Sequence, residues 1–165
     1  MTALSQAEAA EFLYREALIL DRKDFDAWLD LFTPDCLYWM PAWRDDGTQT
    51  ENPDRELSLI YYRGRRNLED RVKRIRSGFS VASEVMPRVS HMVGGVLLDH
   101  ADERTVKLNS SFVVHVQDVR VNRQHSYFGR YEHELTLVDG QWKISEKIIR
   151  LMNDVVPTML DVYSI

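Results

Sequence analysis

The chain has one cysteine, Cys36, so its own side chains form neither an internal disulfide nor an iron–sulfur cluster. Such a cluster needs about four cysteines, or two cysteines and two histidines in the Rieske type. Cys36 stands beside Leu37 in an apolar run, which is the setting of a buried small hydrophobic residue. The sequence therefore predicts no cluster and no thiol chemistry in this chain.

Long apolar segments are also missing. No window approaches about 18 uninterrupted apolar residues, and the first residues lack a basic stretch followed by an apolar one. The net charge of −5 argues against a general affinity for nucleic acid. No glycine-rich phosphate-binding pattern is present, so nucleotide binding is not supported. We expect a cytoplasmic protein that binds neither membrane nor nucleic acid.

The five histidines show no close pairing at helical spacing, which a two-histidine, one-carboxylate iron site on one helix would need. No metal ligand or cofactor-binding residue is therefore predicted. The chain also lacks repeats and Pro/Gly-rich linkers. With 165 residues, 44% of them hydrophobic, it is predicted to form a single domain over residues 1–165.

Helical patterns dominate the first half. A capping box over residues 5–8 and apolar residues at helical intervals predict a helix over 6–20. Asp24 is expected to cap a second helix, whose apolar stripe is Phe25, Trp28, Leu29 and Phe32. A strand over 36–43 and a loop over 44–55 follow. Residues 68–79 then predict a third helix that is basic on its outside.

The second half is rich in Val, Ile, Phe and Tyr and predicts strands over 90–98, 104–117, 125–138 and 141–152. Alternation puts Val106, Leu108, Phe112, Val114 and Val116 on one face of their strand, with mostly polar residues on the other. Asp139-Gly140 predicts a tight hairpin turn, and Gly94-Gly95 predicts a bulge or a bend in a strand. Helices followed by a mainly antiparallel sheet give an α+β fold.

One candidate site lies on the covered face of this sheet. His133 is in phase with Tyr131 and Leu135, which is typical of a hydrogen-bonded core histidine. The alternative is a cavity in which His133 or His91 acts as general base. Tyr131 and Tyr38 would then be donors and Asp35 the orienting carboxylate, as proton abstraction beside a carbonyl requires.

A second candidate is an interface within residues 36–76, which are aromatic and then basic. Arginines of this segment either form a solvated face with Glu69 and Asp70 or pair with acidic residues of another chain. Aromatic anchors serve cores and interfaces equally well. The candidate interface residues are Trp39, Trp43, Arg65, Arg71 and Arg74.

Several segments resemble the small, or β, subunits of aromatic-ring-hydroxylating dioxygenases, and within them the benzoate and anthranilate branch. They are Phe-Leu-Tyr-Arg-Glu-Ala at 12–17, Asp-Ala-Trp-Leu at 26–29, Tyr-Trp-Met-Pro-Ala-Trp at 38–43 and Leu-Ser-Leu-Ile-Tyr-Tyr at 57–62. Residues 68–75 and 88–91 continue the likeness. It runs over nearly the whole chain.

The resemblance implies the cone-shaped fold of nuclear transport factor 2, with N-terminal helices packed on a strongly curved sheet. It also implies a non-catalytic subunit that trimerises and positions large α subunits, usually three of each. The α subunit would carry the Rieske [2Fe-2S] cluster and the mononuclear Fe(II), and a separate reductase would supply their electrons from NADH. The complete enzyme would dihydroxylate an aromatic carboxylate such as benzoate, anthranilate or salicylate.

The family assigns no catalytic residue to this subunit. Two other interpretations stay open on the residues alone. The first is a free-standing isomerase or dehydratase of the same cone fold that uses the His, Asp and Tyr set. The second is a ligand-binding module of that architecture without a reaction.

Overall fold

The computed structural model describes residues 3–78 and 85–165. The three helices are α1 (Gln6–Asp21), α2 (Phe25–Asp30) and α3 (Arg65–Arg76), and all of them lie in the first half of the chain. Strands β1 (Phe32–Pro41) and β2 (Ser58–Arg63) lie between α2 and α3. Strands β3 (Arg88–Ala101), β4 (Thr105–Asp118), β5 (Arg123–Val138) and β6 (Gln141–Leu151) follow.

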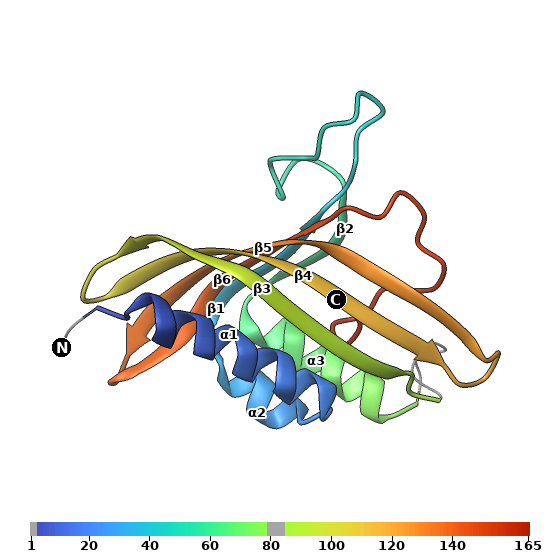
Figure 1. Cartoon of the computed structure of the whole chain (residues 1–165), viewed down its shortest axis with the longest axis horizontal. Helices are drawn as coiled ribbons and strands as arrows, with labels where there is room; N and C mark the ends of the chain where they lie inside the picture. The colour runs from blue at the N-terminus through green and yellow to red at the C-terminus, as the bar shows by residue number, and fades with distance from the viewer. Residues whose placement is uncertain (1–2, 79–84) are drawn as a thin grey trace.

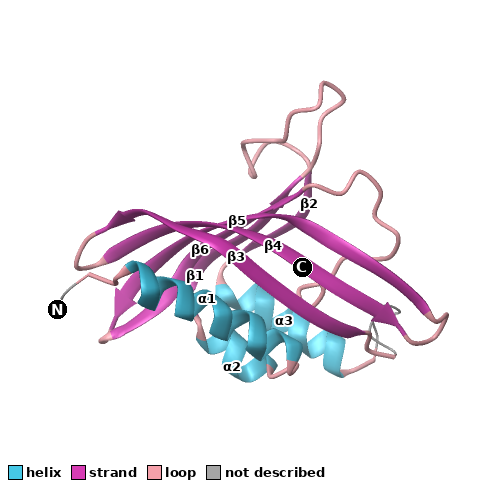
Figure 2. Cartoon of the chain, in the orientation of Figure 1, coloured by secondary structure: helices cyan, strands magenta, loops and turns pink. Residues whose placement is uncertain are grey.

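The six strands form one strongly curved sheet in the order β2-β1-β6-β5-β4-β3 (Figure 1). Every neighbouring pair is antiparallel except β1 and β6, which run parallel. All three helices lie on the same face of this sheet (Figure 2). The predicted α+β arrangement of helices on a mainly antiparallel sheet is confirmed.

The predicted local signals are found at the element ends. Ser5 and Glu8 form the capping box of α1, and the Asp24 side chain accepts a hydrogen bond from the backbone of Ala27 at the start of α2. Asp139 and Gly140 both have positive φ in the turn between β5 and β6. The β3–β4 register shifts after Gly94, and Gly95 has a φ of 58°, so the predicted bulge is present.

The expected helical position of Phe32 is wrong. Helix α2 ends at Asp30, and Phe32 is the first residue of β1, which begins four residues before the predicted strand. Pro34 lies inside β1, where the β1–β6 register is irregular between Phe32 and Leu37. A proline is tolerated there because no regular ladder bond needs its missing N–H. The predicted helical position of Phe79 lies outside the described residues.

The core lies between the helices and the concave face of the sheet. All five residues that alternation placed on one face of β4 are buried. The rings of Trp28 and Phe32 meet edge-to-face at 4.9 Å, and those of Phe112 and Tyr131 stack at 4.1 Å. At Gly129 a Cβ would lie 2.1 Å from the carbonyl oxygen of Arg150, so only glycine fits at this position where β5 pairs with β6.

Two segments without regular structure complete the molecule. Residues 42–57, which we call the arm, rise from the ends of β1 and β2 away from the helices (Figure 1). Residues 152–165 return beneath the sheet, and residues 161–165 are buried. Within the described parts of the chain, no helix is long and apolar enough to span a membrane.

Candidate functional site

A cluster of charged side chains lies in the interior, where α1 faces β5 and β6. The Nζ atom of Lys147 is 2.6 Å from Oε1 of Glu16, and Nε2 of His133 is 3.2 Å from Oε2 of the same carboxylate. The indole N–H of Trp28 also points at Glu16, at 3.4 Å. We call Glu16, His133 and Lys147 the interior cluster. It is held by three different elements.

The charges of the interior cluster follow from its contacts. Burial alone would keep Glu16 neutral, but the Lys147 ammonium and the hydrogen bond from His133 outweigh it and hold the pKa of Glu16 well below its usual range. Burial lowers the pKa of His133, against the opposing effect of Glu16. A neutral His133 that donates from Nε2 to the carboxylate leaves Nδ1 without a partner among the described residues. Glu16 is therefore the ionised acceptor of the cluster.

Two buried tyrosines border the interior cluster. The Lys147 ammonium lies 4.4 Å from the centre of the Tyr131 ring and 5.9 Å from that of Tyr38. Burial is the main cause that raises the pKa of both phenols well above the usual value. Neither hydroxyl has a hydrogen-bond partner within the described chain. Both phenols therefore stay protonated at neutral pH.

The structure brings together three of the five predicted cavity residues, His133, Tyr131 and Tyr38. Asp35 is exposed and accepts a hydrogen bond from Thr33 at 2.9 Å, so the carboxylate beside His133 is Glu16 instead. His91 lies on the edge strand β3, where its Nδ1 is 2.6 Å from Asp21. It ties β3 to the end of α1 and takes no part in the cluster.

Glu16 and Lys147 are not among the residues predicted for the cavity from the sequence. Glu16 falls on the buried stripe of α1 with Ala9, Leu13, Ala17 and Leu20, and Lys147 is in phase with buried Ile149 and Leu151 on β6. A lone charge of each sign on an apolar face is the signal that pairs them. The space lined by Glu16, His91, Tyr131 and Lys147 is too small for a water molecule. This side of the cluster therefore has no room for a substrate.

The described residues include neither a set of metal ligands nor a reactive thiol. Among the described residues, no three His, Cys, Asp or Glu side chains lie close enough to hold a metal ion. Burial raises the pKa of Cys36 to about 11, so its thiol stays protonated at neutral pH. The predicted placement of Cys36 in the core is confirmed.

The two candidate interface tryptophans differ in exposure. Trp39 is 3% exposed and packs on the convex side of the sheet with Leu37, Tyr61 and Ile148. Its indole N–H donates to Ser58 at 2.8 Å. Trp43 stands at the base of the arm, is 42% exposed, and donates to the backbone of Leu151 at 2.9 Å.

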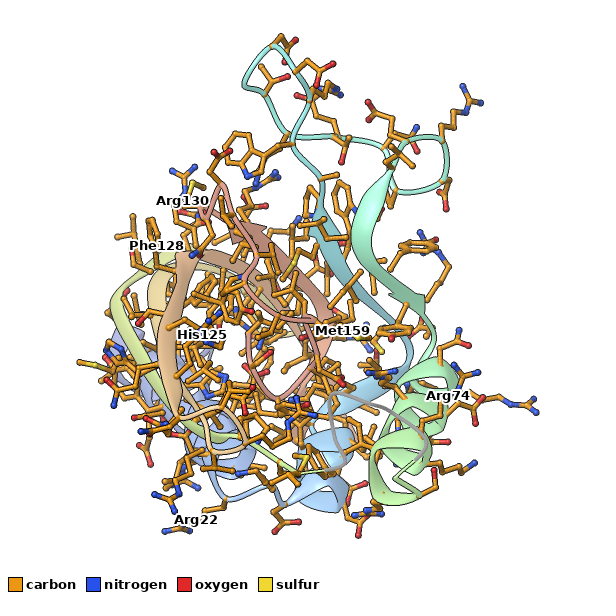
Figure 3. The ribbon with its side chains drawn as sticks, turned by 90° about the vertical axis from the view of Figure 1, so that its right-hand side faces the viewer. Arg22, Arg74, His125, Phe128, Arg130 and Met159 are labelled. Atoms are coloured by element: carbon orange, nitrogen blue, oxygen red, sulfur yellow. The ribbon has the colours of Figure 1, made fainter. Side chains whose placement is uncertain are left out.

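The three candidate arginines of α3 are also unlike one another. Arg65 lies 3.1 Å from Asp30 and 3.0 Å from Glu69. Arg71 forms a bidentate pair with the buried carboxylate of Asp161, so its expected place on the outside of the helix is wrong. Arg74 is exposed, points away from the molecule (Figure 3), and has no side-chain partner in the described residues.

The arm is held by an internal polar network. Arg44 donates to Glu56 at 3.1 Å, to Thr48 at 2.9 Å and to the carbonyl of Gln49 at 2.7 Å. Glu56 in turn accepts from the backbone N–H groups of Glu51 and Asn52, both at 2.7 Å. These hydrogen bonds, with that from Arg44 as the largest cause, lower the pKa of Glu56 to about 2. The arm is therefore an organised surface feature.

The sequence of this chain matches the family described as the ring hydroxylating beta subunit over residues 15–158. The chain belongs to this family. It is 35% identical to the benzoate 1,2-dioxygenase subunit beta of Acinetobacter baylyi, over 100% of this chain and 96% of the relative. The crystal structure of the benzoate 1,2-dioxygenase beta subunit from Burkholderia mallei has a TM-score of 0.82 and 34% identity, and each chain is covered completely.

The resemblance to ring-hydroxylating beta subunits that the sequence predicted is thus confirmed. The fold of this chain is shared more widely. A putative scytalone dehydratase from Novosphingobium aromaticivorans matches with a TM-score of 0.67 at 16% identity, over 92% of this chain and 87% of the other. The predicted cone-shaped architecture is therefore also confirmed. The beta subunit is one component of a ring-hydroxylating oxidoreductase.

Proposed function

We propose that this beta subunit is the non-catalytic part of a Rieske non-haem iron dioxygenase that acts on an aromatic carboxylate. Relatives that are 31–35% identical over at least 94% of this chain are the small subunits of benzoate, 2-halobenzoate, toluate and anthranilate dioxygenases. All four are named for aromatic carboxylates. This shared substrate class is the observation that carries the proposal.

A structural role fits the closed interior. In a free-standing isomerase or dehydratase of this fold, the cone would need room for substrate beside an available base. Here Lys147 and His133 are both occupied by Glu16, and the space that Lys147 lines with Glu16 and Tyr131 is too small for a water molecule. The interior cluster therefore contributes to the rigidity of the sheet and presents no reactive group.

The Rieske cluster and the mononuclear iron would be held by a large α subunit. This chain offers one buried, protonated thiol and no converging set of metal ligands in its described part, so its residues do not fit either group. Its contribution would be to fix the large subunits relative to one another. Electron transfer between a cluster and an iron on neighbouring α subunits depends on that placement.

Co-expression with the candidate large subunit tests this role. We expect the two chains to co-purify as three of each, with iron in the purified material. With reductase and NADH, oxygen uptake should depend on benzoate or a related carboxylate, and the isolated beta subunit should show no turnover. A beta subunit that binds no large subunit, or that converts a substrate alone, would contradict the proposal.

A further inference from the structure

The arm is an acidic surface. It holds five carboxylates and two arginines, which gives residues 42–57 a net charge of −3. Arg44 and Glu56 neutralise each other inside the network. Asp45 and Glu51 are exposed, and their side chains have no hydrogen-bond or ion-pair partner in the part of the chain that the structure describes.

Helix α3 carries the opposite charge. Six basic and two acidic residues give it a net charge of +4, although Arg65, Arg71 and Arg76 are paired with Asp30, Asp161 and Asp26 from outside the helix. Its buried stripe is Leu68, Val72 and Ile75, so Arg66, Lys73 and Arg74 project outward. Lys73 reaches Asp70 at 3.4 Å, whereas Arg66 and Arg74 have no side-chain partner among the described residues.

These two surfaces are kept apart within one chain. Strand β2 joins them, and its six residues span about 20 Å at 3.3 Å per residue. In Figure 3 the arm is at the top, and Arg74 lies below it on the far side of β2. Strand β2 is also an edge of the sheet. Leu57, the last residue of the arm, is 82% exposed, and Leu59 on β2 is 43% exposed. An apolar strip therefore lies between an acidic and a basic surface.

We propose that the arm of one beta subunit packs against α3 of the next copy. The opposite charges fit a second copy of this chain, because each copy supplies both halves of the contact. A contact between two different surfaces is heterologous and closes into a ring when the rotation allows. Leu57 and Leu59 supply apolar area, and the charges set register and orientation.

This contact names the surfaces of the self-association that belongs to the proposed function, and it rests on that function. Charge reversal tests it on the full-length chain. The arm variant is Asp45→Lys with Glu51→Lys, which changes the arm to +1. The helix variant is Arg66→Glu, Lys73→Glu and Arg74→Glu, which changes α3 to −2. Each variant sets like charges against each other.

We expect the unaltered chain to have the native mass of three copies. Each variant should raise the concentration at which half of the assembly dissociates by at least about tenfold, with unchanged circular dichroism. The chain that combines both variants has opposite charges again and should regain most of the assembly. A monomeric unaltered chain, unaffected single variants, or a folded combined chain that stays dissociated would each overturn the proposal.

Glu11→Lys with Glu103→Lys is the matched control. Both carboxylates are exposed, on α1 and the β3–β4 turn, and the pair changes the net charge as much as the arm variant does. It should leave the assembly intact; an equal loss would mean that total charge, and not the contact, decides assembly. Failure of this contact is distinguishable from failure of the proposed function, because a beta subunit that is monomeric alone can still co-purify with large subunits.

Discussion

Glu16 and Lys147 lie inside the molecule with side chains that are 4% and 1% exposed, whereas Asp45 and Arg66 project into solvent from the arm and α3. The interior charges satisfy one another, and removing either leaves the other buried without its partner. The surface charges are complementary but lie at opposite ends of β2. The contrast separates interior charges, which are satisfied within the fold, from surface charges, which are available for the proposed association.

Lys147→Met should break the interior side of this comparison most strongly. The carboxylate of Glu16 would remain buried with only His133 and Trp28 to bond it, and breaking a buried ion pair costs about 3–5 kcal/mol. Urea unfolding followed by circular dichroism should show that loss in the free energy of unfolding.

The companion variant Glu16→Gln with Lys147→Met removes both charges and should recover much of the stability, because no lone charge stays buried. If the double variant is as unstable as Lys147→Met alone, the effect comes from packing and not from the charge.

Arg71 and Arg74 sharpen the comparison within a single helix. Arg71→Ala would leave the carboxylate of Asp161 buried without its bidentate partner and should cost about 2–3 kcal/mol of unfolding free energy. Arg74→Ala should change it by less than about 0.5 kcal/mol, since that side chain is solvated. Thermal melts of the two variants side by side provide the measurement. Equal losses would show that both faces of α3 are packed.

The difference between these arginines also shows where sequence reasoning stops. Helical periodicity predicted all three helices, and the strand pattern predicted β3 to β6 of the second half and the burial of His133. Local patterns suffice for this because they determine which face of an element is apolar. The partner of Arg71 is Asp161, 90 residues away, and no local pattern indicates that the last residues return beneath the sheet. Three-dimensional pairing of distant charges is the information that one sequence lacks.

The same limit applies to the interior cluster. Tyr131 and His133 were predicted to face the covered side of the sheet because they are in phase on one strand, and both are buried. Asp35 was predicted to be the orienting carboxylate, but it is exposed while Tyr38 is buried, because alternate residues of a strand point to opposite faces. Glu16 came from a different element. It was recognisable only as a charge in the apolar stripe of α1.

Acid should weaken the interior cluster in two steps. Burial keeps the pKa of His133 below its unfolded value of about 6.5, so stability is complete above that pH and falls as the unfolded chain takes up the proton. The loss is at most about 1.4 kcal/mol per pH unit. Glu16 adds a second loss below about pH 4.5, because its pKa is also lowered in the fold.

Urea unfolding at pH 7, 6 and 5 checks the first step. His133→Gln should show a smaller decrease over this range than the unaltered chain, since glutamine does not titrate. The matched control is His115→Gln, which changes an exposed histidine whose partner is the uncharged Ser126 hydroxyl and should keep the decrease of the unaltered chain. Parallel pH dependences of the His133 variant and the unaltered chain would assign the loss to other groups.

Arg44→Met should have the smallest effect on folding and so tests the surface side of the comparison. None of residues 42–57, all of them described, belongs to the hydrophobic core, so the free energy of unfolding should change by less than about 0.5 kcal/mol. Without its hydrogen bonds from Arg44, Glu56 would no longer hold the arm together, and limited proteolysis should cut within residues 44–56 several-fold faster. Arg55→Met, at an exposed arginine outside the network, should leave the cleavage rate unchanged. Equal cleavage of both variants would show that the arm is ordered by its backbone turns and not by Arg44.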